Sequence, residues 1–258
     1  MSEAARDNIA ACAAIVHKGD PARFRAAMAA PLGLREKLLV LFAFNVEVAR
    51  APWVTREAMI AEMRLQWWHD ALGEIAAGGA VRRHEVVTPL AACLAPDQAL
   101  GLQQLVAARR WDIYPEPFAD EAALWAHMDA TSGTLLRAAL ALGGGTATPA
   151  LSEGFAAVGL AGWLTAVPAL RAQNRHPLPD ASEAAIVRLA GEALGKLAPA
   201  RKAPLPRLAR RALLAGWQSA PLLRLAAKEP ARVANGTLEL APFRAQTRLA
   251  RLALTNRW

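Results

Sequence analysis

Carboxylate pairs spaced for one helix face are the residues of this 258-residue chain that could do chemistry. Side chains at positions i and i+4 share a helix face, so two carboxylates at that spacing can hold one divalent cation. Asp70 and Glu74 form such a pair. At about 100° per residue, however, Asp70 lies roughly 200° from Trp68 on the apolar face of the expected helix. We therefore expect both acids to face solvent.

The other closely spaced acids offer no better metal site. Glu3 and Asp7 lie near a helix end that we expect to be frayed. Glu116 and Asp120 lie in a proline-containing segment that reads as a loop, and Glu47 stands alone on its helix face. The sequence therefore predicts no metal centre of the carboxylate type.

Thiols and imidazoles are equally uninformative about catalysis. Cys12 and Cys93 are far apart in the sequence and have no redox or metal-binding spacing, so we expect two reduced, buried thiols. None of the five histidines pairs with another at i+3 or i+4, which argues against a zinc site.

Helix-forming residues dominate the composition. The hydrophobic fraction is 54%, and much of it is Ala and Leu, which favour helices. Side chains that cap helix starts recur before proline or before an acidic residue. The expected capping pairs are Asp20 with Pro21, Thr88 with Pro89, Thr148 with Pro149, Asp180 with Glu183, and Asp97 after Pro96. We therefore predict a single all-α domain.

The apolar pattern sets the expected helix boundaries. Helices are predicted at 20–29, 34–48, 53–76, 97–111, 120–142, 149–170 and 180–197, followed by a loop at 198–206 and basic helices at 207–227 and 242–256. In the last helix, Arg244, Arg248 and Arg251 share one face. Gly143 and its two following glycines read as a helix terminus. No apolar run approaches the roughly 18–20 residues of a membrane span, and no secretory leader is evident.

The charge distribution is uneven. Residues 201–258 hold twelve Arg or Lys and two acids, a balance of +10, whereas the first 200 residues balance at −2. Such a basic end suggests an acidic partner or an anionic membrane surface. Nucleic acid is not expected, because no binding motif accompanies the charge. We expect a protein of the bacterial cytoplasm, peripheral at the inner membrane.

Two passages resemble the squalene/phytoene synthase family. The first comprises DPARF at 20–24, REKLLVLFAFNVEVAR at 35–50 and RLQWWHDAL at 64–72, and the second runs from ATSGTLL at 130–136 to RHPLP at 175–179. The resemblance implies an isoprenoid synthase-like helical bundle over residues 1–258 around a central cavity. It also implies head-to-head condensation of isoprenoid diphosphates, with Mg²⁺ held by two aspartate-rich motifs.

The residues at both of those motifs depart from the family pattern. The first pair of expected aspartates falls on Ala49 and Arg50, neither of which binds Mg²⁺. In the second motif the expected acids fall on Leu170, Gln173 and Asn174. A diphosphate leaving group requires a cation held by carboxylates, so catalysis is not expected.

A remodelled cavity is the expectation that remains. Its candidate residues are Asn45, Glu47, Arg50, Arg64, Trp67, Trp68, Thr131, Arg171, Gln173, Asn174 and Arg175. Glu47 is expected to pair with Arg50 or Arg64 in place of a metal cluster. We favour core packing for Trp67 and Trp68 over an isoprenoid-lining role. Thr131 is expected to let helices approach closely, and Arg171 with Arg175 to form an internal or anion-facing site.

The leading functional expectation is a non-catalytic protein without cofactor. The resemblance is greatest to the branch that includes a mitochondrial complex I assembly factor and its bacterial relatives, which implies a respiratory complex I subunit or assembly intermediate as partner. Two alternatives stay open. One is an active prenyltransferase that recruits Mg²⁺ elsewhere, and the other is a carrier that binds an isoprenoid or lipid without converting it.

Overall fold

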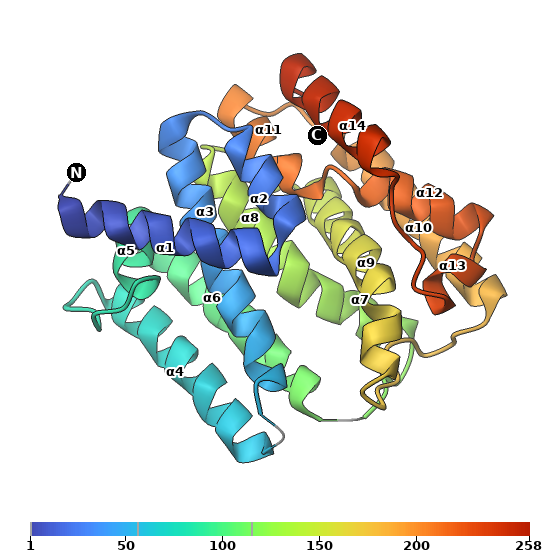
Figure 1. Cartoon of the computed structure of the whole chain (residues 1–258), viewed down its shortest axis with the longest axis horizontal. Helices are drawn as coiled ribbons and strands as arrows, with labels where there is room; N and C mark the ends of the chain where they lie inside the picture. The colour runs from blue at the N-terminus through green and yellow to red at the C-terminus, as the bar shows by residue number, and fades with distance from the viewer. Residues whose placement is uncertain (1, 56, 115) are drawn as a thin grey trace. The chain divides into compact units, whose positions relative to one another are not determined.

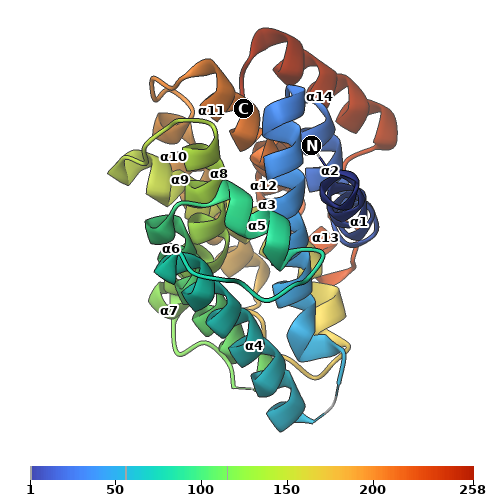
Figure 2. The same ribbon diagram turned by 90° about the vertical axis from the view of Figure 1, so that its left-hand side faces the viewer.

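Helices are the only regular elements in the computed structural model, which describes residues 2–55, 57–114 and 116–258 (Figures 1 and 2). The predicted all-α class is therefore confirmed. Within this fold the chain divides into two compact units, and each is built from segments that are separated in the sequence.

Unit 1 contains the residues up to Tyr114, together with Thr134–Thr146 and Pro206–Ala215. Its elements are α1 (Glu3–Gly19), α2 (Pro21–Met28), α3 (Leu32–Arg50), the 3-10 turn η1 (Ala51–Trp53), α4 (Ala58–Ala77), α5 (Val87–Cys93), α6 (Pro96–Ala108), the 3-10 turn η2 (Arg109–Ile113), α8 (Thr134–Leu142), α11 (Arg207–Ala212) and most of the 3-10 turn η4 (Leu213–Gly216).

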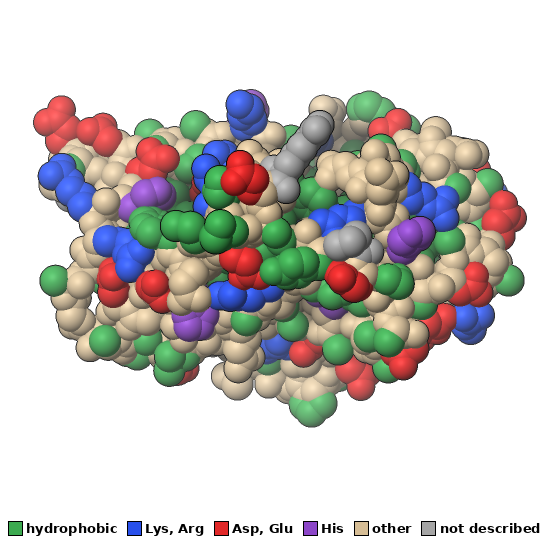
Figure 3. Space-filling view, turned by 90° about the horizontal axis from the view of Figure 1, so that it is seen from below, with side chains coloured by type: hydrophobic (Ala, Val, Ile, Leu, Met, Phe, Trp, Pro, Cys, Tyr) green, Lys and Arg blue, Asp and Glu red, His purple; other side chains and the backbone are tan. Residues whose placement is uncertain are grey.

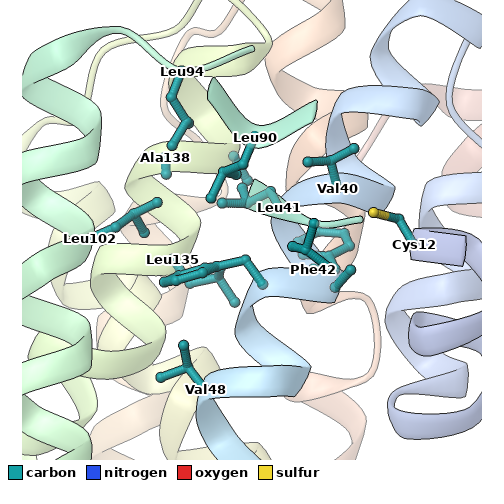
Figure 4. Close-up of a cluster of buried hydrophobic side chains, with 14 of the residues drawn as sticks. Cys12, Val40, Leu41, Phe42, Val48, Leu90, Leu94, Leu102, Leu135 and Ala138 are labelled. Atoms are coloured by element: carbon teal, nitrogen blue, oxygen red, sulfur yellow. The ribbon is translucent and has the colours of Figure 1, made fainter. Parts of the chain in front are cut away.

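Helix α3 is the centre of unit 1. Its residues from Leu38 to Phe44 are buried without interruption. A helix that is apolar on every side must be enclosed, and α3 packs against α1, α2, α5, α8 and α11. Figure 4 shows the resulting cluster, in which Cys12 of α1, Leu41 of α3 and Leu135 of α8 belong to one buried core.

Unit 2 contains Pro115–Gly133, Ala147–Leu205 and Gly216–Trp258. Its elements are α7 (Glu121–Met128), the π-helical turn η3 (Asp129–Gly133), α9 (Pro149–Arg171), α10 (Glu183–Ala200), α12 (Ser219–Lys228), α13 (Ala231–Ala234) and α14 (Pro242–Thr255). Helix α9 packs against α7, η3, α10, α12 and α13. Gly154 permits the closest approach, since a Cβ there would lie 2.3 Å from Cβ of Ala200.

Helix α9 is also long and apolar enough to cross a membrane by length and composition, contrary to the expectation that no such segment exists. Its Ala and Gly residues give a mean hydropathy of 1.4 without a continuous run of large apolar side chains. Because 61% of this stretch is buried inside the protein, we interpret α9 as a core helix.

Two of the predicted helix caps are confirmed. Asp20 Oδ1 accepts a hydrogen bond from the Arg23 backbone N–H at 2.9 Å, and Thr148 Oγ1 accepts one from Leu151 N–H at 3.3 Å. Each satisfies a donor that the first helical turn leaves open. The predicted glycine terminus is confirmed as well, because Gly144 follows α8 with φ of 75°.

The other predicted caps are wrong. Helix α10 begins at Glu183, so the adjacent Ser182 is its cap, and Asp180 instead accepts from the Ser182 N–H. Asp97 already lies in the first turn of α6. Thr88 lies inside α5, where its hydroxyl oxygen accepts from His84 N–H.

Several predicted boundaries also need correction. Helix α1 was not expected, because only Cys12 and Val16 of its seventeen residues are buried and its apolar pattern is correspondingly weak. The helix predicted at 53–76 begins at Ala58, after η1, and Arg56 lies outside the described residues. The helix predicted at 120–142 is divided by η3 into α7 and α8.

The basic end of the chain differs from its prediction in three ways. The loop predicted at 198–206 begins later, because α10 continues to Ala200. The helix predicted at 207–227 is interrupted by η4, which separates α11 from α12. In α14, the three arginines expected on one face differ in burial: Arg244 and Arg251 are exposed, but Arg248 is half-buried and its Nε donates to the Trp217 carbonyl at 2.7 Å.

The contact between Gly143 and α11 generates a stability prediction. A Cβ on Gly143 would lie 2.6 Å from Ala209 Cα and 2.7 Å from its backbone nitrogen, so the main chain itself would have to move. We expect Gly143→Ala to lower the free energy of unfolding by about 1–3 kcal/mol. Gly101→Ala, in α6 with open space around it, is the matched control and should change stability by at most about 1 kcal/mol, in the favourable direction. Urea unfolding followed by circular dichroism measures both values, and equal effects would contradict the packing argument.

The thiol of Cys12 is buried as expected, whereas that of Cys93 is only partly buried, and the Cys12 thiol generates a pH prediction. Burial, followed by the charge of Glu85, raises the pKa of Cys12 from 9.0 to about 12. The folded state therefore holds the thiol proton more tightly than the unfolded state, so its contribution to stability is complete below pH 9 and is lost as the pH rises from 9 towards 12. We expect Cys12 to remove about 1 kcal/mol of unfolding free energy between about pH 8 and about pH 10. The Cys12→Ala variant should lose this part of the slope, and an unchanged slope would contradict the prediction.

Candidate functional site

A cavity of about 190 Å³ in unit 1 is the candidate functional site. The residues that line it are Glu47, Arg50, Ala51, Arg64, Trp67, Trp68 and His84. The last turn of α3 supplies the acid and one arginine, and α4 supplies the second arginine and both tryptophans. The structure thus brings together five of the eleven residues predicted to form a remodelled cavity.

An ion pair closes the α3 side of this cavity. Arg50 Nη1 lies 3.0 Å from Glu47 Oε1, one helical turn away. Of the two predicted pairings, the one with Arg50 is therefore confirmed, whereas Arg64 is exposed on α4. The Glu47 side chain is 19% exposed and that of Arg50 is 56% exposed, so solvent screens the pair and its stabilisation is modest. The pair matters more for chemistry, because a Glu47 carboxylate that is neutralised by Arg50 is not free to hold a metal ion.

Three aromatic rings form the opposite wall. The centroids of Trp67 and Trp68 lie 4.9 Å apart, and His84 lies 5.1 Å from Trp67 and 5.5 Å from Trp68. The core prediction is confirmed for Trp68, which is buried against Phe44 at 5.5 Å. It is wrong for Trp67, which is 36% exposed. Neighbouring residues on a helix point about 100° apart, so only one of the two can face the core.

Arg82 supports the cavity residue Trp67, and the sequence did not reveal it. Its Nη2 donates to Glu74 Oε1 at 2.5 Å, its Nη1 donates to the Trp67 carbonyl at 3.2 Å, and its guanidinium carbon lies 4.8 Å from the Trp67 ring. The hydrogen bonds from Arg82 lower the pKa of Glu74. Glu74 is thus partly exposed but ion-paired with Arg82, whereas Asp70 is exposed as expected. Gly78, with φ of 68°, ends α4 and turns the chain back, which helix periodicity cannot reveal.

Asn45 and Thr131 are buried, each within its own unit. Asn45 lies on α3 and is 7% exposed. The hydroxyl of Thr131, in the π-helical turn η3, donates to the His127 carbonyl of α7 at 2.6 Å. That turn packs against α9, where a Cβ on Gly159 would lie 2.7 Å from Ser132 Cβ. The prediction that this segment allows close helix packing is confirmed, and the Thr131 hydroxyl is committed to the backbone.

The remaining candidates terminate α9. Arg171 is its last residue, and the chain then turns through Asn174, whose φ is 59°. The Arg175 N–H donates to the Leu170 carbonyl at 3.1 Å and the Asn174 N–H donates to the Arg171 carbonyl at 2.9 Å, which is a Schellman closure. The prediction that Arg171 and Arg175 are neighbours on one helix face is therefore wrong. Arg171, Gln173 and Asn174 are exposed.

The donor atoms at these positions do not fit Mg²⁺. Glu47 is paired with Arg50, Ala49 and Leu170 carry no donor, and Asn174 serves a backbone turn. Over residues 2–55, 57–114 and 116–258, no three His, Cys, Asp or Glu side chains gather closely enough to hold a metal ion. Mg²⁺ prefers several oxygen ligands in octahedral geometry, which these residues do not supply.

An exposed apolar stripe continues from the cavity along α4. Met59, Met63 and Trp67 are spaced by four residues and are 72%, 66% and 36% exposed. This spacing puts them on one helix face. Figure 3 views the molecule from the side on which α4 begins, and hydrophobic side chains lie among charged ones on that face. Sequence reasoning assigned the stripe no role, although the i, i+4, i+8 spacing of two methionines and a tryptophan was readable.

Comparison with known proteins identifies a family and similar solved structures for this chain. Residues 16–244 match the squalene/phytoene synthase family. No curated protein matches. Among solved structures, a dehydrosqualene synthase crystallised with a ligand is 13% identical, with a TM-score of 0.76 and 97% of each chain covered. The squalene synthase HpnC from Alicyclobacillus acidocaldarius is 18% identical, with a TM-score of 0.59, and the match covers 99% of this chain and 97% of that one. At these identities the structures confirm the isoprenoid synthase-like helical fold, and the family match shows that this protein belongs to the squalene/phytoene synthase family.

Proposed function

We propose that this protein is a non-catalytic member of its family that binds a partner instead of condensing isoprenoid diphosphates. The observation that carries the proposal is the Glu47–Arg50 ion pair. Arg50 occupies a position where the family's pattern has an aspartate, and its guanidinium neutralises the one carboxylate in the cavity lining. The second expected motif is a helix-ending turn at Asn174. Both departures support loss of catalysis.

The chemistry of the family reaction supports the same reading. Departure of a diphosphate requires neutralisation of the charge that develops on it, which carboxylate-held cations supply. Arg50 and Arg64 could meet a phosphate oxygen, yet Arg50 is engaged with Glu47 and Arg64 projects from an exposed position. An active prenyltransferase would need its metal ligands from elsewhere.

A protein partner is supported by the stripe on α4. Exposed apolar patches mark interaction surfaces, and methionine adapts its shape to a partner. Met59 and Met63 extend this surface away from the cavity. By resemblance to the branch of complex I assembly factors, we propose a subunit or assembly intermediate of respiratory complex I as the partner. The basic residues of 201–258 would hold the protein at the anionic inner membrane of a bacterium, on the cytoplasmic side.

A turnover assay tests the non-catalytic assignment. Purified protein is incubated with farnesyl or geranylgeranyl diphosphate, with and without Mg²⁺, beside an active family member, and diphosphate release is measured. We expect no release above the protein-free rate, because no carboxylate cluster organises the cation. Mg²⁺-dependent release would overturn the assignment. Isoprenoid or lipid that co-purifies from native extract, without turnover, would instead favour the carrier function.

A complementation assay tests the partner surface. Deletion of the gene in its host should lower the amount of assembled complex I, measured by native gel activity, and the wild-type protein should restore it. The double variant Met59→Lys with Met63→Lys should fail to restore it, because two charges would be desolvated at the interface. Leu100→Lys is the matched control, since Leu100 of α6 is 53% exposed and lies outside the stripe. Full restoration by the double variant would show that the stripe is not the binding surface. Unaltered complex I in the deletion strain would show that complex I is not the partner.

A further inference from the structure

Three arginines from separate segments of unit 2 lie near one another. Arg201 follows α10, Arg224 lies on α12 and Arg248 lies on α14, in the orange-to-red part of the chain in Figure 1. Burial, followed by the positive charges of Arg248 and Arg224, lowers the pKa of Arg201 to about 10. Each of the three is thus close enough to another to repel it, and Arg201 is still charged at neutral pH.

The arginines are held in place from outside the cluster. Arg248 Nε donates to the Trp217 carbonyl at 2.7 Å, which fixes α14 against the chain before α12. Helices α10 and α12 pack against each other. The Arg201 guanidinium carbon lies 6.0 Å from the centre of the Trp258 ring. Arg201 and Arg248 are therefore positioned by a ring contact and by a backbone hydrogen bond, whereas Arg224 is exposed beside them on α12.

No acidic side chain among the described residues pairs with this charge. Within the described ranges, none of the three arginines forms an ion pair with an acidic side chain, and the Nε of Arg201 is buried without a hydrogen-bond partner. Residues 193–228 contain no Asp or Glu. The next acid, Glu229, is engaged by Arg232 at 2.5 Å. A half-buried guanidinium without a partner is costly, and an external anion would relieve the cost.

We propose that Arg201, Arg224 and Arg248 form a binding site for a phosphate oxyanion, carried either by a free phosphate or diphosphate or by a lipid headgroup. Guanidinium groups suit this ligand, because their planar donors form charge-assisted hydrogen bonds to phosphate oxygens. The site goes beyond the proposed function, since it lies in residues that neither the cavity nor the α4 stripe uses. It can exist whether or not the protein is catalytic.

Thermal unfolding with inorganic phosphate and with pyrophosphate tests the site, in chloride-matched buffer so that ionic strength is constant. We expect the wild-type Tm to rise by several degrees with a saturable dependence on the anion. Arg201→Gln and Arg224→Gln should each weaken apparent anion affinity by about tenfold or more. Lys228→Gln removes the same charge from an exposed position on α12 and should retain the wild-type response.

The variants also separate a binding role from a structural one. Without anion, Arg201→Gln should raise the Tm, because it relieves burial of an unpartnered charge. A fall in the Tm would indicate a structural role and would overturn the proposal. Flotation with phosphatidylcholine vesicles, with and without phosphatidic acid, distinguishes the sources. A protein that binds phosphatidic acid vesicles but does not respond to free phosphate or pyrophosphate would recognise a lipid headgroup. This vesicle binding should be lost in both arginine variants and kept in Lys228→Gln.

The overturning results are equally specific. A response to neither phosphate, pyrophosphate nor phosphatidic acid would exclude the site. A response that Lys228→Gln weakens as much as Arg201→Gln does would indicate general attraction to the basic end of the chain and would also exclude it. Either result leaves the proposed function untouched, because that proposal is tested by turnover and by complex I assembly.

Discussion

Burial of α3 on every side is the constraint on which unit 1 depends. Each large apolar side chain withdrawn from water contributes on the order of 1.5–3 kcal/mol, and α3 carries seven consecutive buried residues from Leu38 to Phe44. Five helices must surround it to realise that gain. The last turn of α3 then emerges at the cavity, so Glu47 and Arg50 are positioned by the same packing that stabilises the unit. A family scaffold can thus keep its fold while the chemistry at this turn changes.

The sequence predicted the elements whose apolar pattern is strong, and missed those whose stability comes from elsewhere. Helix α3 and the long helix α9 were readable because their buried residues dominate the local pattern. Helix α1 was not readable, because it buries only Cys12 and Val16 among alanines and charges. The π-helical turn η3 was not predicted either, because the sequence was read as one continuous helix across it.

The candidate site shows the same division. The Glu47–Arg50 pair was predictable, because residues three apart on a helix are neighbours whatever surrounds them. The Glu74–Arg82 pair was not, because it requires the reversal of the chain at Gly78. The turn after Arg171 depends on one residue, Asn174, adopting a left-handed conformation, and a helical projection carried Arg175 onto the wrong face. Pairs within one helix could therefore be predicted from the sequence, and pairs that depend on a turn could not.

The discontinuity of unit 1 has a consequence for the order of folding during synthesis. Its final segment, Pro206–Ala215, is translated after most of unit 2, and the backbone of Ala209 lies directly against Gly143. The amino-terminal half therefore leaves the ribosome with part of its core uncovered until α11 arrives. Neither unit corresponds to a continuous fragment that could be expressed alone, and cotranslational protection of α3 by chaperones would be most needed in that interval.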